Sequence, residues 1–443
     1  MLSDLAFELA QHDDSVWVIT SRQLYDAPDA RLPAHETCHG VSIRRVATSR
    51  FGRKSSLGRA IDYLTFYVSS AWALWKIARE GDLVVAKTDP PLLGVVVGPI
   101  ARLRRAVLVN WLQDIFPEVA EATGFARHRL ARFAFRLLAA LRNRSLRVAA
   151  ANVVIGERMA ARLEALAVSP SRIHFIPNWT DGSSIRPVDH AGNSLRAAWD
   201  LSGKFVIGYS GNLGRAHDYS TFLDAIELVE AQDTSKKLTN DNAMAGAVPA
   251  YGESCPGIVW LFIGGGASFR ALQVEVCRRG LTSVQFRDYQ PRERLAESLS
   301  TADVHLISLS PGLEGLIVPS KYYGIAAAGR PAIFVGDENG EIAQILRNTG
   351  SGYSVRPGQG IALAELVAQL AENPARVREM GRNARTAFDQ RYDQRRAMAS
   401  WVALLDKISG EEATRRDFGL SRSQSALLIA QKAGRNKRRE LTR

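Results

Sequence analysis

The sequence predicts an α/β protein with two doubly wound, parallel-sheet domains facing a cleft. Short apolar segments such as 82–87, 106–111 and 258–263 alternate with helical segments along most of the chain. Such strand–helix alternation is typical of a parallel sheet. The chain has 443 residues, of which 46% are apolar. This length suits two domains, and this composition suits two buried cores.

The first domain is expected over residues 1–190. Its first segment, 2–10, predicts a helix, and 16–20 predicts a strand. A domain of this class normally begins with a strand and a Gly-rich turn, and the sequence shows neither before this helix. We therefore expect the first strand of this domain to be missing.

The second domain is expected over residues 191–385, followed by a crossing helix over 386–410. Residues 231–257 are polar and lack an apolar period, which predicts a surface insertion. The final helical segment, about 374–408, is expected to break near Tyr392. Residues 411–443 are weakly patterned, and we expect a mobile tail there.

The formal net charge of +12 is unevenly distributed. Residues 1–200 carry 26 Lys and Arg against 19 Asp and Glu, residues 201–410 carry 22 of each, and residues 411–443 carry 9 against 4. A basic first half points to an anionic partner, with a membrane surface or a lipid-linked phosphate favoured. No nucleic-acid-binding motif is present, so we expect no nucleic-acid partner.

Residues 127–149 form a segment rich in arginine. Helical spacing places four apolar side chains on one face, namely Leu130, Phe133, Leu137 and Leu141. This pattern fits a helix lying in a membrane interface, and it equally fits a core helix with solvated arginines. Aromatic residues also crowd the helix expected at 60–80, either as core or as an apolar acceptor patch; they are Tyr63, Phe66, Tyr67, Trp72 and Trp75.

Two loops offer places for a ligand phosphate. Residues 210–215 follow an apolar strand and precede a helix, and their glycines let backbone N–H groups approach a phosphate. The segment 313–336 combines a loop, a helix of small residues and a buried strand, and it contains Glu314 and Lys321. Ligands of such sheets lie at the carboxyl ends of strands.

Four blocks together resemble family 4 glycosyltransferases with the two-Rossmann (GT-B) fold: NWLQDIFPE, FIPNWTD, YSGNLGRAHDYSTFLDA and the Pro-Ser-Lys loop. The likeness covers the chain to about residue 408. It is strongest to the bacterial branch that builds exopolysaccharide and O-antigen, including fucosyl- and N-acetylfucosaminyltransferases.

The resemblance implies a retaining, metal-independent transferase of the hexosyl type. Its donor would be a UDP- or GDP-sugar held mainly by the second domain, with no other cofactor. Its acceptor would be a lipid-linked saccharide bound by the first domain. The enzyme would be cytoplasmic and peripheral, with the first domain at the inner face of the plasma membrane.

The resemblance also implies which residues meet the donor diphosphate. They are expected to include Gly211, Asn212, Arg215 and His217 of the first loop. Asn212 stands where many relatives carry an arginine, so Arg215 or His217 would supply the missing charge. The alternative for this block is an ordinary turn between a strand and a helix.

Further donor contacts are implied in the second half. Lys321, after the Ser320 turn, is the expected catalytic cation for the leaving diphosphate. Glu314 would meet the donor sugar hydroxyls. The second carboxylate of relatives falls on Gly324, so Glu341 would bind the ribose instead, unless it is a plain helix-start acid.

Three residues complete the expected site. Gly265 lets the nucleotide lie close, and Tyr289 flanks the base. Asp114 ends a strand of the first domain, where it would orient or deprotonate the acceptor hydroxyl, or simply cap the turn before Pro117. Glu118 is a secondary candidate for the same role.

Two other functions remain open from the sequence. A sugar-nucleotide 2-epimerase shares this fold and would act on the donor alone. A chain without its first strand could also be an inactive, truncated glycosyltransferase-like partner protein.

Overall fold

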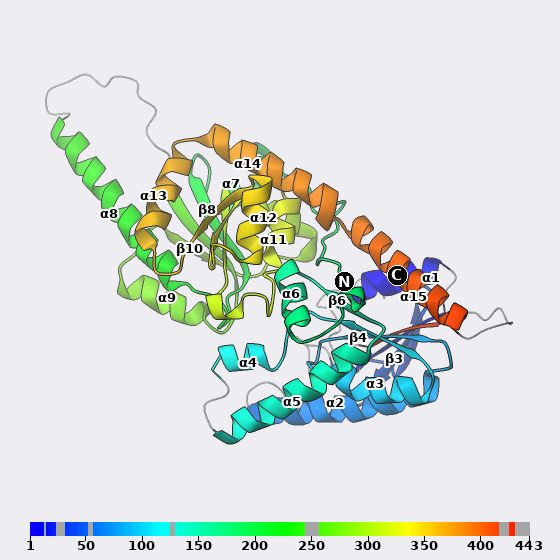
Figure 1. Ribbon diagram of the computed structural model, residues 1–443. Coiled ribbons are helices and arrows are strands. Elements are labelled where there is room, and N and C mark those ends of the chain that lie inside the picture. The colour runs from blue at the N-terminus through cyan, green and yellow to red at the C-terminus, as the bar shows by residue number, and fades with distance from the viewer. Residues whose placement is uncertain are drawn as a thin grey trace. The chain divides into compact units, whose positions relative to one another are not determined.

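The computed structural model of the protein describes residues 1–12, 15–23, 32–51, 56–124, 129–243, 257–415 and 425–429. The chain divides into two compact units. Unit 1 comprises Met1–Asn178, Gly315–Ile317 and Arg395–Arg443, and unit 2 comprises Trp179–Glu314 and Val318–Gln394. In Figure 1 most of unit 1 is blue to cyan, and unit 2 runs from green to orange.

Unit 1 contains an eight-stranded sheet with the order β2-β3-β1-β14-β4-β5-β6-β7. All neighbouring strands are parallel except β2 and β3. The strands are β1 (Ser15–Ser21), β2 (His35–Cys38), β3 (Val41–Val46), β4 (Leu83–Lys87), β5 (Val107–Trp111), β6 (Ala151–Val154), β7 (Ile173–Phe175) and β14 (Ser425–Ile429).

Strand β14 fills an interior place in this sheet. It pairs with β1 on one side and β4 on the other, with Leu428 opposite both Val18 and Val85. Its residues Leu427, Leu428 and Ile429 are fully buried, as expected of a parallel strand covered on both faces. A strand from the segment 411–443 therefore completes the sheet of unit 1. The expectation that this whole segment is a mobile tail is wrong for Ser425–Ile429.

The helices of unit 1 are α1 (Leu2–Gln11), α2 (Ser56–Ile77), α3 (Leu93–Leu103), α4 (Glu118–Ala122), α5 (Arg129–Val148), α6 (Glu157–Ala165) and α15 (Gln394–Arg415). Helix α3 contacts both α2 and α5, and these three helices lie side by side (Figure 1). Trp401 of α15 is buried edge-on against Trp111 of β5, with ring centroids 4.9 Å apart. This contact anchors α15 to the unit 1 core.

Unit 2 contains a six-stranded, fully parallel sheet with the order β10-β9-β8-β11-β12-β13. The strands are β8 (Phe205–Asn212), β9 (Ile258–Gly265), β10 (Val284–Arg287), β11 (Val304–Ser308), β12 (Ala332–Val335) and β13 (Gly352–Val355). Numbered from β8, this is the 3-2-1-4-5-6 order of doubly wound nucleotide-binding sheets. The strand order reverses between β8 and β11.

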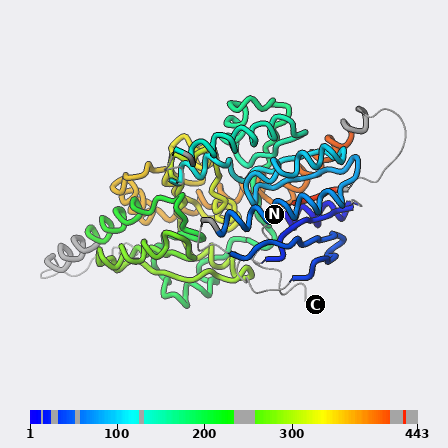
Figure 2. Tube along the Cα trace, turned by 90° about the horizontal axis from the view of Figure 1, so that it is seen from below, coloured from blue at the N-terminus to red at the C-terminus, as the bar shows by residue number. Residues whose placement is uncertain are grey.

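The helices of unit 2 are α7 (Ser194–Ala198), α8 (Ser220–Ala243), α9 (Phe269–Arg278), α10 (Leu295–Leu299), α11 (Lys321–Ala327), α12 (Glu341–Thr349), α13 (Gly360–Ala371) and α14 (Pro374–Ala387). Figure 2 shows this unit, in green to orange, from a second direction. Its core contains a run of aromatic rings that includes Tyr209, Phe222 and Phe262, with centroids 6.1–6.5 Å apart. These rings fix β8, β9 and α8 against one another.

The boundary between the units falls after Asn178, earlier than the expected residue 190. Residues after Asn178 are held by arginines of unit 2. Arg385 donates to the carbonyl of Ile185 (3.0 Å), and Arg330 donates to that of Val188 (2.7 Å). These side chains lie far along the chain, so the sequence of the connection does not reveal them.

Two other expectations change. Residues 231–243, read as part of a surface insertion, continue helix α8; residues 244–256 lie outside the described part of the chain. The expected crossing helix at 386–410 consists of the end of α14, a π-helical turn at Phe388–Tyr392, and α15, which extends to Arg415. The expected break near Tyr392 is confirmed by this turn.

In the described residues, no helix is both long and apolar enough to cross a bilayer.

Candidate functional site

The candidate donor site lies at the carboxyl ends of β8 and β11, where the strand order of unit 2 reverses. Ligands of open α/β sheets bind at this switch point because the loops from the two strands diverge there. The loop after β8 carries Arg215 and His217, and the segment after β11 leads to Lys321 at the start of α11. Sequence positions about 100 residues apart are thus brought together.

Glycines allow the strand ends to approach one another. Gly211 and Gly264 are opposite residues of β8 and β9. A Cβ on Gly264, whose φ is +132°, would lie only 2.3 Å from the Gly211 carbonyl oxygen. A Cβ on Gly265 would lie 3.2 Å from the Tyr289 ring, and one on Gly211 would lie 3.2 Å from Cε of Lys321. Gly211, Gly265, Tyr289 and Lys321, all expected in the site, are therefore close neighbours.

The Lys321 side chain lies between His217 and Tyr209, beside Gly211 and Gly264 at the carboxyl ends of β8 and β9, here called the glycine edge. Its Nζ lies 3.1 Å from Nε2 of His217 and 5.0 Å from the centroid of the Tyr209 ring. Burial lowers the pKa of Lys321 to about 8. The amine is therefore largely charged at pH 7, but it gives up its proton far more readily than an exposed lysine.

His217 does not supply the positive charge that we expected of it. Burial, followed by the neighbouring Lys321, lowers the pKa of His217 to about 4, although a hydrogen bond to the Ser308 carbonyl opposes this shift. The imidazole is neutral at pH 7. Arg215, which is exposed on the same loop, keeps the role of a candidate phosphate-binding cation.

Asn212 and Ser320, two further residues expected in the site, are accessible. Asn212 ends β8 with an exposed side chain, and its Oδ1 lies 2.2 Å from the position that a Cβ on Gly266 would take. Only a glycine leaves room for that amide. Ser320 is exposed immediately before Lys321.

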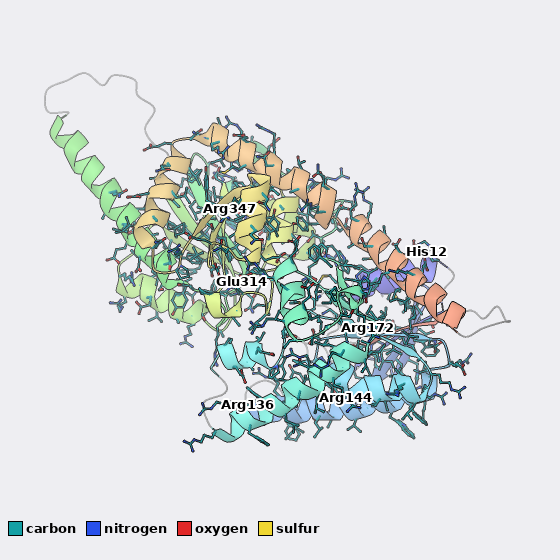
Figure 3. The ribbon with its side chains drawn as sticks, in the orientation of Figure 1. His12, Arg136, Arg144, Arg172, Glu314 and Arg347 are labelled. Carbon is teal, nitrogen blue, oxygen red and sulfur yellow. The ribbon has the colours of Figure 1, made fainter. Side chains whose placement is uncertain are left out.

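Glu314 and Glu341 form a separate pair in unit 2. Oε1 of Glu314 accepts a hydrogen bond from the backbone N–H of Glu341 (2.7 Å). Glu341 is the first residue of α12 and is buried. The Glu314 carboxylate, labelled in Figure 3, therefore caps the positive end of this helix. Contact of either residue with sugar or ribose hydroxyls stays a prediction.

Asp114 belongs to unit 1, just after β5. It lines a small pocket, with about 20 Å³ of space for a water-sized molecule, whose wall includes Thr88, Asn110, Arg142 and Ser145. Burial, followed by the charges of Tyr63, Asp114 and Asp89, raises the pKa of Tyr67, so Tyr67 stays neutral nearby.

Glu118, the secondary candidate, has a structural partner. Its Oε1 lies 2.6 Å from Nη2 of Arg142, whose guanidinium is almost completely buried. A buried ion pair of this kind holds both side chains in place. Arg142 therefore does not belong to the exposed basic face of α5.

Two residues of the site were not predicted from the sequence. Tyr209 lies under the Lys321 amine, and Ser308 presents its carbonyl to His217. Tyr209 lies within β8 at the start of a recognised block and Ser308 ends β11, but the sequence does not show that either would lie beside Lys321 or His217. Among the described residues, no three His, Cys, Asp or Glu side chains are grouped closely enough to hold a metal ion.

Two family profiles match the chain. The profile described as "Glycosyl transferase 4-like domain" matches residues 1–179, and that described as "Glycosyl transferases group 1" matches residues 194–387. The chain is also 28% identical over 340 residues to "Probable glycosyltransferase WbjE" of Pseudomonas aeruginosa. That match covers 75% of this chain and 76% of the relative.

Solved structures show the same fold. Sucrose-phosphate synthase from Thermosynechococcus elongatus superposes with a TM-score of 0.70 and 18% identity, covering 92% of each chain. HepE of Anabaena, in complex with UDP and glucose, gives a TM-score of 0.62 and 15% identity, covering 89% of this chain and all of that one. The expected GT-B fold, with two parallel-sheet α/β domains, is confirmed. With both of its domains matched, the chain belongs to the group 1 (family 4) glycosyltransferases.

Proposed function

We propose that this enzyme transfers a hexose-type sugar, with retention of configuration, from a nucleoside diphosphate donor to a lipid-linked saccharide. The observation that carries the donor part is the Lys321 amine at the switch point of unit 2. It lies beside the glycine edge of β8 and β9 and, among the described residues, forms no ion pair. A lysine without a counter-ion at the carboxyl ends of β8 and β11 suits an anionic ligand.

The proposed donor is a UDP- or GDP-sugar. HepE, which shares the fold, holds UDP and glucose. In transfer, the bond between the anomeric carbon and the diphosphate oxygen breaks, and its electron pair leaves with the diphosphate. A new bond forms from the acceptor oxygen, and the Asp114 carboxylate takes the hydroxyl proton. Lys321 and backbone N–H groups stabilise the departing charge, so no divalent metal is required.

The proposed pathway is surface polysaccharide assembly. WbjE is described as a glycosyltransferase, and WaaG, another protein of the same fold, is described as involved in lipopolysaccharide biosynthesis. The description of WbjE supports glycosyl transfer, and that of WaaG supports a role in surface polysaccharide assembly for this chain. A fucosyl or N-acetylfucosaminyl donor is our specific choice within it.

The donor assignment is tested by thermal shift with UDP, GDP and their sugars, because a ligand of the folded state raises its apparent stability. The stabilising sugar nucleotide is then supplied to membranes containing lipid-linked saccharides. We expect transfer that persists in EDTA. Lys321→Ala should lower turnover at least about tenfold, the cost of one charged contact.

Lys204→Ala is the matched control, because Lys204 only pairs with Asp200 on the surface of unit 2. It should keep wild-type turnover. The proposal fails if no nucleotide stabilises the protein or if EDTA abolishes transfer. Conversion of the donor into an epimer without any acceptor would establish the 2-epimerase instead.

The proposed site of membrane contact is the outer surface of α2, α3 and α5 in unit 1, here called the α2–α5 face. Helical spacing brings exposed apolar side chains into line on it. They are Leu64, Val68, Trp72 and Trp75 of α2, Leu103 of α3, and Phe133, Leu137 and Leu141 of α5. Phe133 is 68% exposed and Val68 is 64% exposed. These exposures favour an interfacial α5 over a core-packed one.

The charge of the α2–α5 face selects an anionic lipid surface as its partner. Helices α3 and α5 contain no acidic residue. The single acid of α2, Asp62, is buried, and its carboxylate accepts hydrogen bonds from Ser49 and Phe51. Arginines surround the apolar side chains; Arg136 and Arg144 project from α5 in Figure 3. Apolar side chains would enter the lipid interface while arginines meet its phosphates.

Membrane contact is tested by sedimentation with vesicles of phosphatidylcholine, with and without phosphatidylglycerol. We expect binding only to the anionic vesicles, weakened by salt. The double substitution Phe133→Ser and Leu137→Ser should weaken binding at least about tenfold, because each side chain contributes ~1.5–3 kcal/mol on burial.

The matched control is Val274→Ser with Ile361→Ser, two exposed apolar residues of unit 2. This variant should bind the vesicles as the wild type does. Equal binding by the α5 variant would remove the α2–α5 face from the proposal. Dimerisation without vesicles, lost in the α5 variant, would assign the face to a second copy instead.

A further inference from the structure

The surroundings of His217 fix which of its ring nitrogens carries the proton. Nδ1 lies 2.6 Å from the carbonyl oxygen of Ser308, which can only accept a hydrogen bond. Nδ1 must therefore carry hydrogen, and in the neutral ring Nε2 is left with a lone pair. Nε2 faces Nζ of Lys321 at 3.1 Å. The imidazole accordingly accepts a hydrogen bond from the Lys321 ammonium.

This acceptor holds the ammonium without neutralising it. A carboxylate in the same place would form an ion pair, and an incoming diphosphate would have to compete with it. The Tyr209 ring face, 5.0 Å from Nζ, and the backbone at Gly211 confine the rest of the side chain. Lys321 is thus oriented by uncharged groups on each of these sides.

We propose that His217 is a positioning residue that orients the Lys321 ammonium towards the donor diphosphate, and that diphosphate binding is coupled to the protonation of Lys321. This inference rests on the proposed function of the site. It assigns to His217 an indirect role, in place of the direct phosphate contact expected from the sequence.

The protonation of the two residues supports the coupling. The pKa of Lys321 is about 8 in the free protein because of burial. An adjacent diphosphate favours the charged amine and raises that pKa. Below about pH 8 the amine already carries its proton, so affinity is constant. Above it, binding must take up a proton, and affinity falls up to about tenfold per pH unit.

Tyr209 and His217, the two titratable groups that face Nζ of Lys321, do not change charge in this range. Tyr209 faces Nζ from β8, and burial raises its pKa. His217, from the loop after β8, titrates near pH 4. At the far end of α11, Arg385 of α14 donates to the Ala327 carbonyl, and Tyr392 packs against Tyr322 and Tyr323. The buried tyrosines Tyr322 and Tyr323 have raised pKa values.

The experiment measures the affinity of whichever of UDP or GDP stabilises the wild type, by calorimetry from about pH 7 to about pH 9.5. The terminal phosphate is ionised across this range. For the wild type we expect constant affinity to about pH 8, a decline above it, and proton uptake seen as a buffer-dependent heat. His217→Leu removes the acceptor and should lower affinity about tenfold at pH 7, with the decline beginning at a lower pH.

Two further variants separate this role from a loss of fold. His217→Gln keeps a side-chain oxygen as acceptor and should recover most of the affinity. In a Lys321→Ala background, His217→Leu should have almost no additional effect, because its role acts through Lys321. The inference is overturned if His217→Leu binds with the wild-type affinity and pH profile, or if its effect persists without Lys321. Failure of the wild type to bind either nucleotide would instead overturn the proposed function.

Discussion

Gly264 sets the spacing of the donor site through the absence of one carbon atom. Its φ of +132° is open to glycine but not to other residues, and a Cβ there would meet the Gly211 carbonyl oxygen at 2.3 Å. We expect Gly264→Ala to push β8 and β9 apart at their carboxyl ends. Stability should fall by about 1–3 kcal/mol, and stabilisation by UDP or GDP in thermal shift should be lost.

Gly203→Ala is the matched control for this substitution. Gly203 also has a positive φ (+70°), but nothing lies within 4 Å of its Cβ position. The control should lose about 1–2 kcal/mol of stability and keep its response to the nucleotide. An equal loss of nucleotide response in both variants would show that backbone strain, and not the close approach to Gly211, is responsible.

The sequence predicts the residues of the site better than it predicts the side chains and carbonyls that contact them. Lys321, Gly211 and Tyr289 stand out in loops after apolar strands, and the structure places them together. The neutral state of His217 could not be read from its motif, because Ser308 and Lys321 lie 91 and 104 residues further along the chain. Burial and hydrogen-bond partners determine such a pKa, and both arise only on folding.

Strand β14 is a secondary-structure element that likewise could not be predicted from the sequence. Its apolar residues are too few to be separated from a weakly patterned basic segment by periodicity alone. What makes them a strand is the space between β1 and β4, which offers hydrogen-bond partners on both sides. Residues 231–243 of helix α8 were likewise expected to belong to a surface insertion, because they are polar and lack an apolar period.

Replacing one side chain of β14 tests its place in the sheet. Leu428 is fully buried, and Leu428→Ala should cost about 2–5 kcal/mol. Hydrogen exchange should show faster exchange in β1 and β4, with β8 and β9 unchanged. Leu103→Ala, at a residue that is 70% exposed, provides the same chemical change without loss of a buried contact. Wild-type exchange in Leu428→Ala would contradict the placement of β14.

At the scale of the whole molecule, the alternation of strand and helix segments along the sequence predicted two parallel-sheet domains, and the structure confirms them. The order of strands was not predictable, because it depends on pairings between distant segments. The charge asymmetry was informative: the basic first half contains α5, whose exposed face carries arginines and no acids. The unit boundary was missed because Arg330 and Arg385 hold residues that precede them by more than 140 positions.

The distant origin of β14 has a consequence for biosynthesis. All six strands of unit 2 lie between residues 205 and 355, so they leave the ribosome as one continuous stretch. The sheet of unit 1 cannot be completed until residue 429 has been synthesised, roughly ten to fifty seconds after residue 178 at typical translation speeds. During this interval β14 cannot pair with β1 and β4, and unpaired strand edges are templates for pairing with other chains.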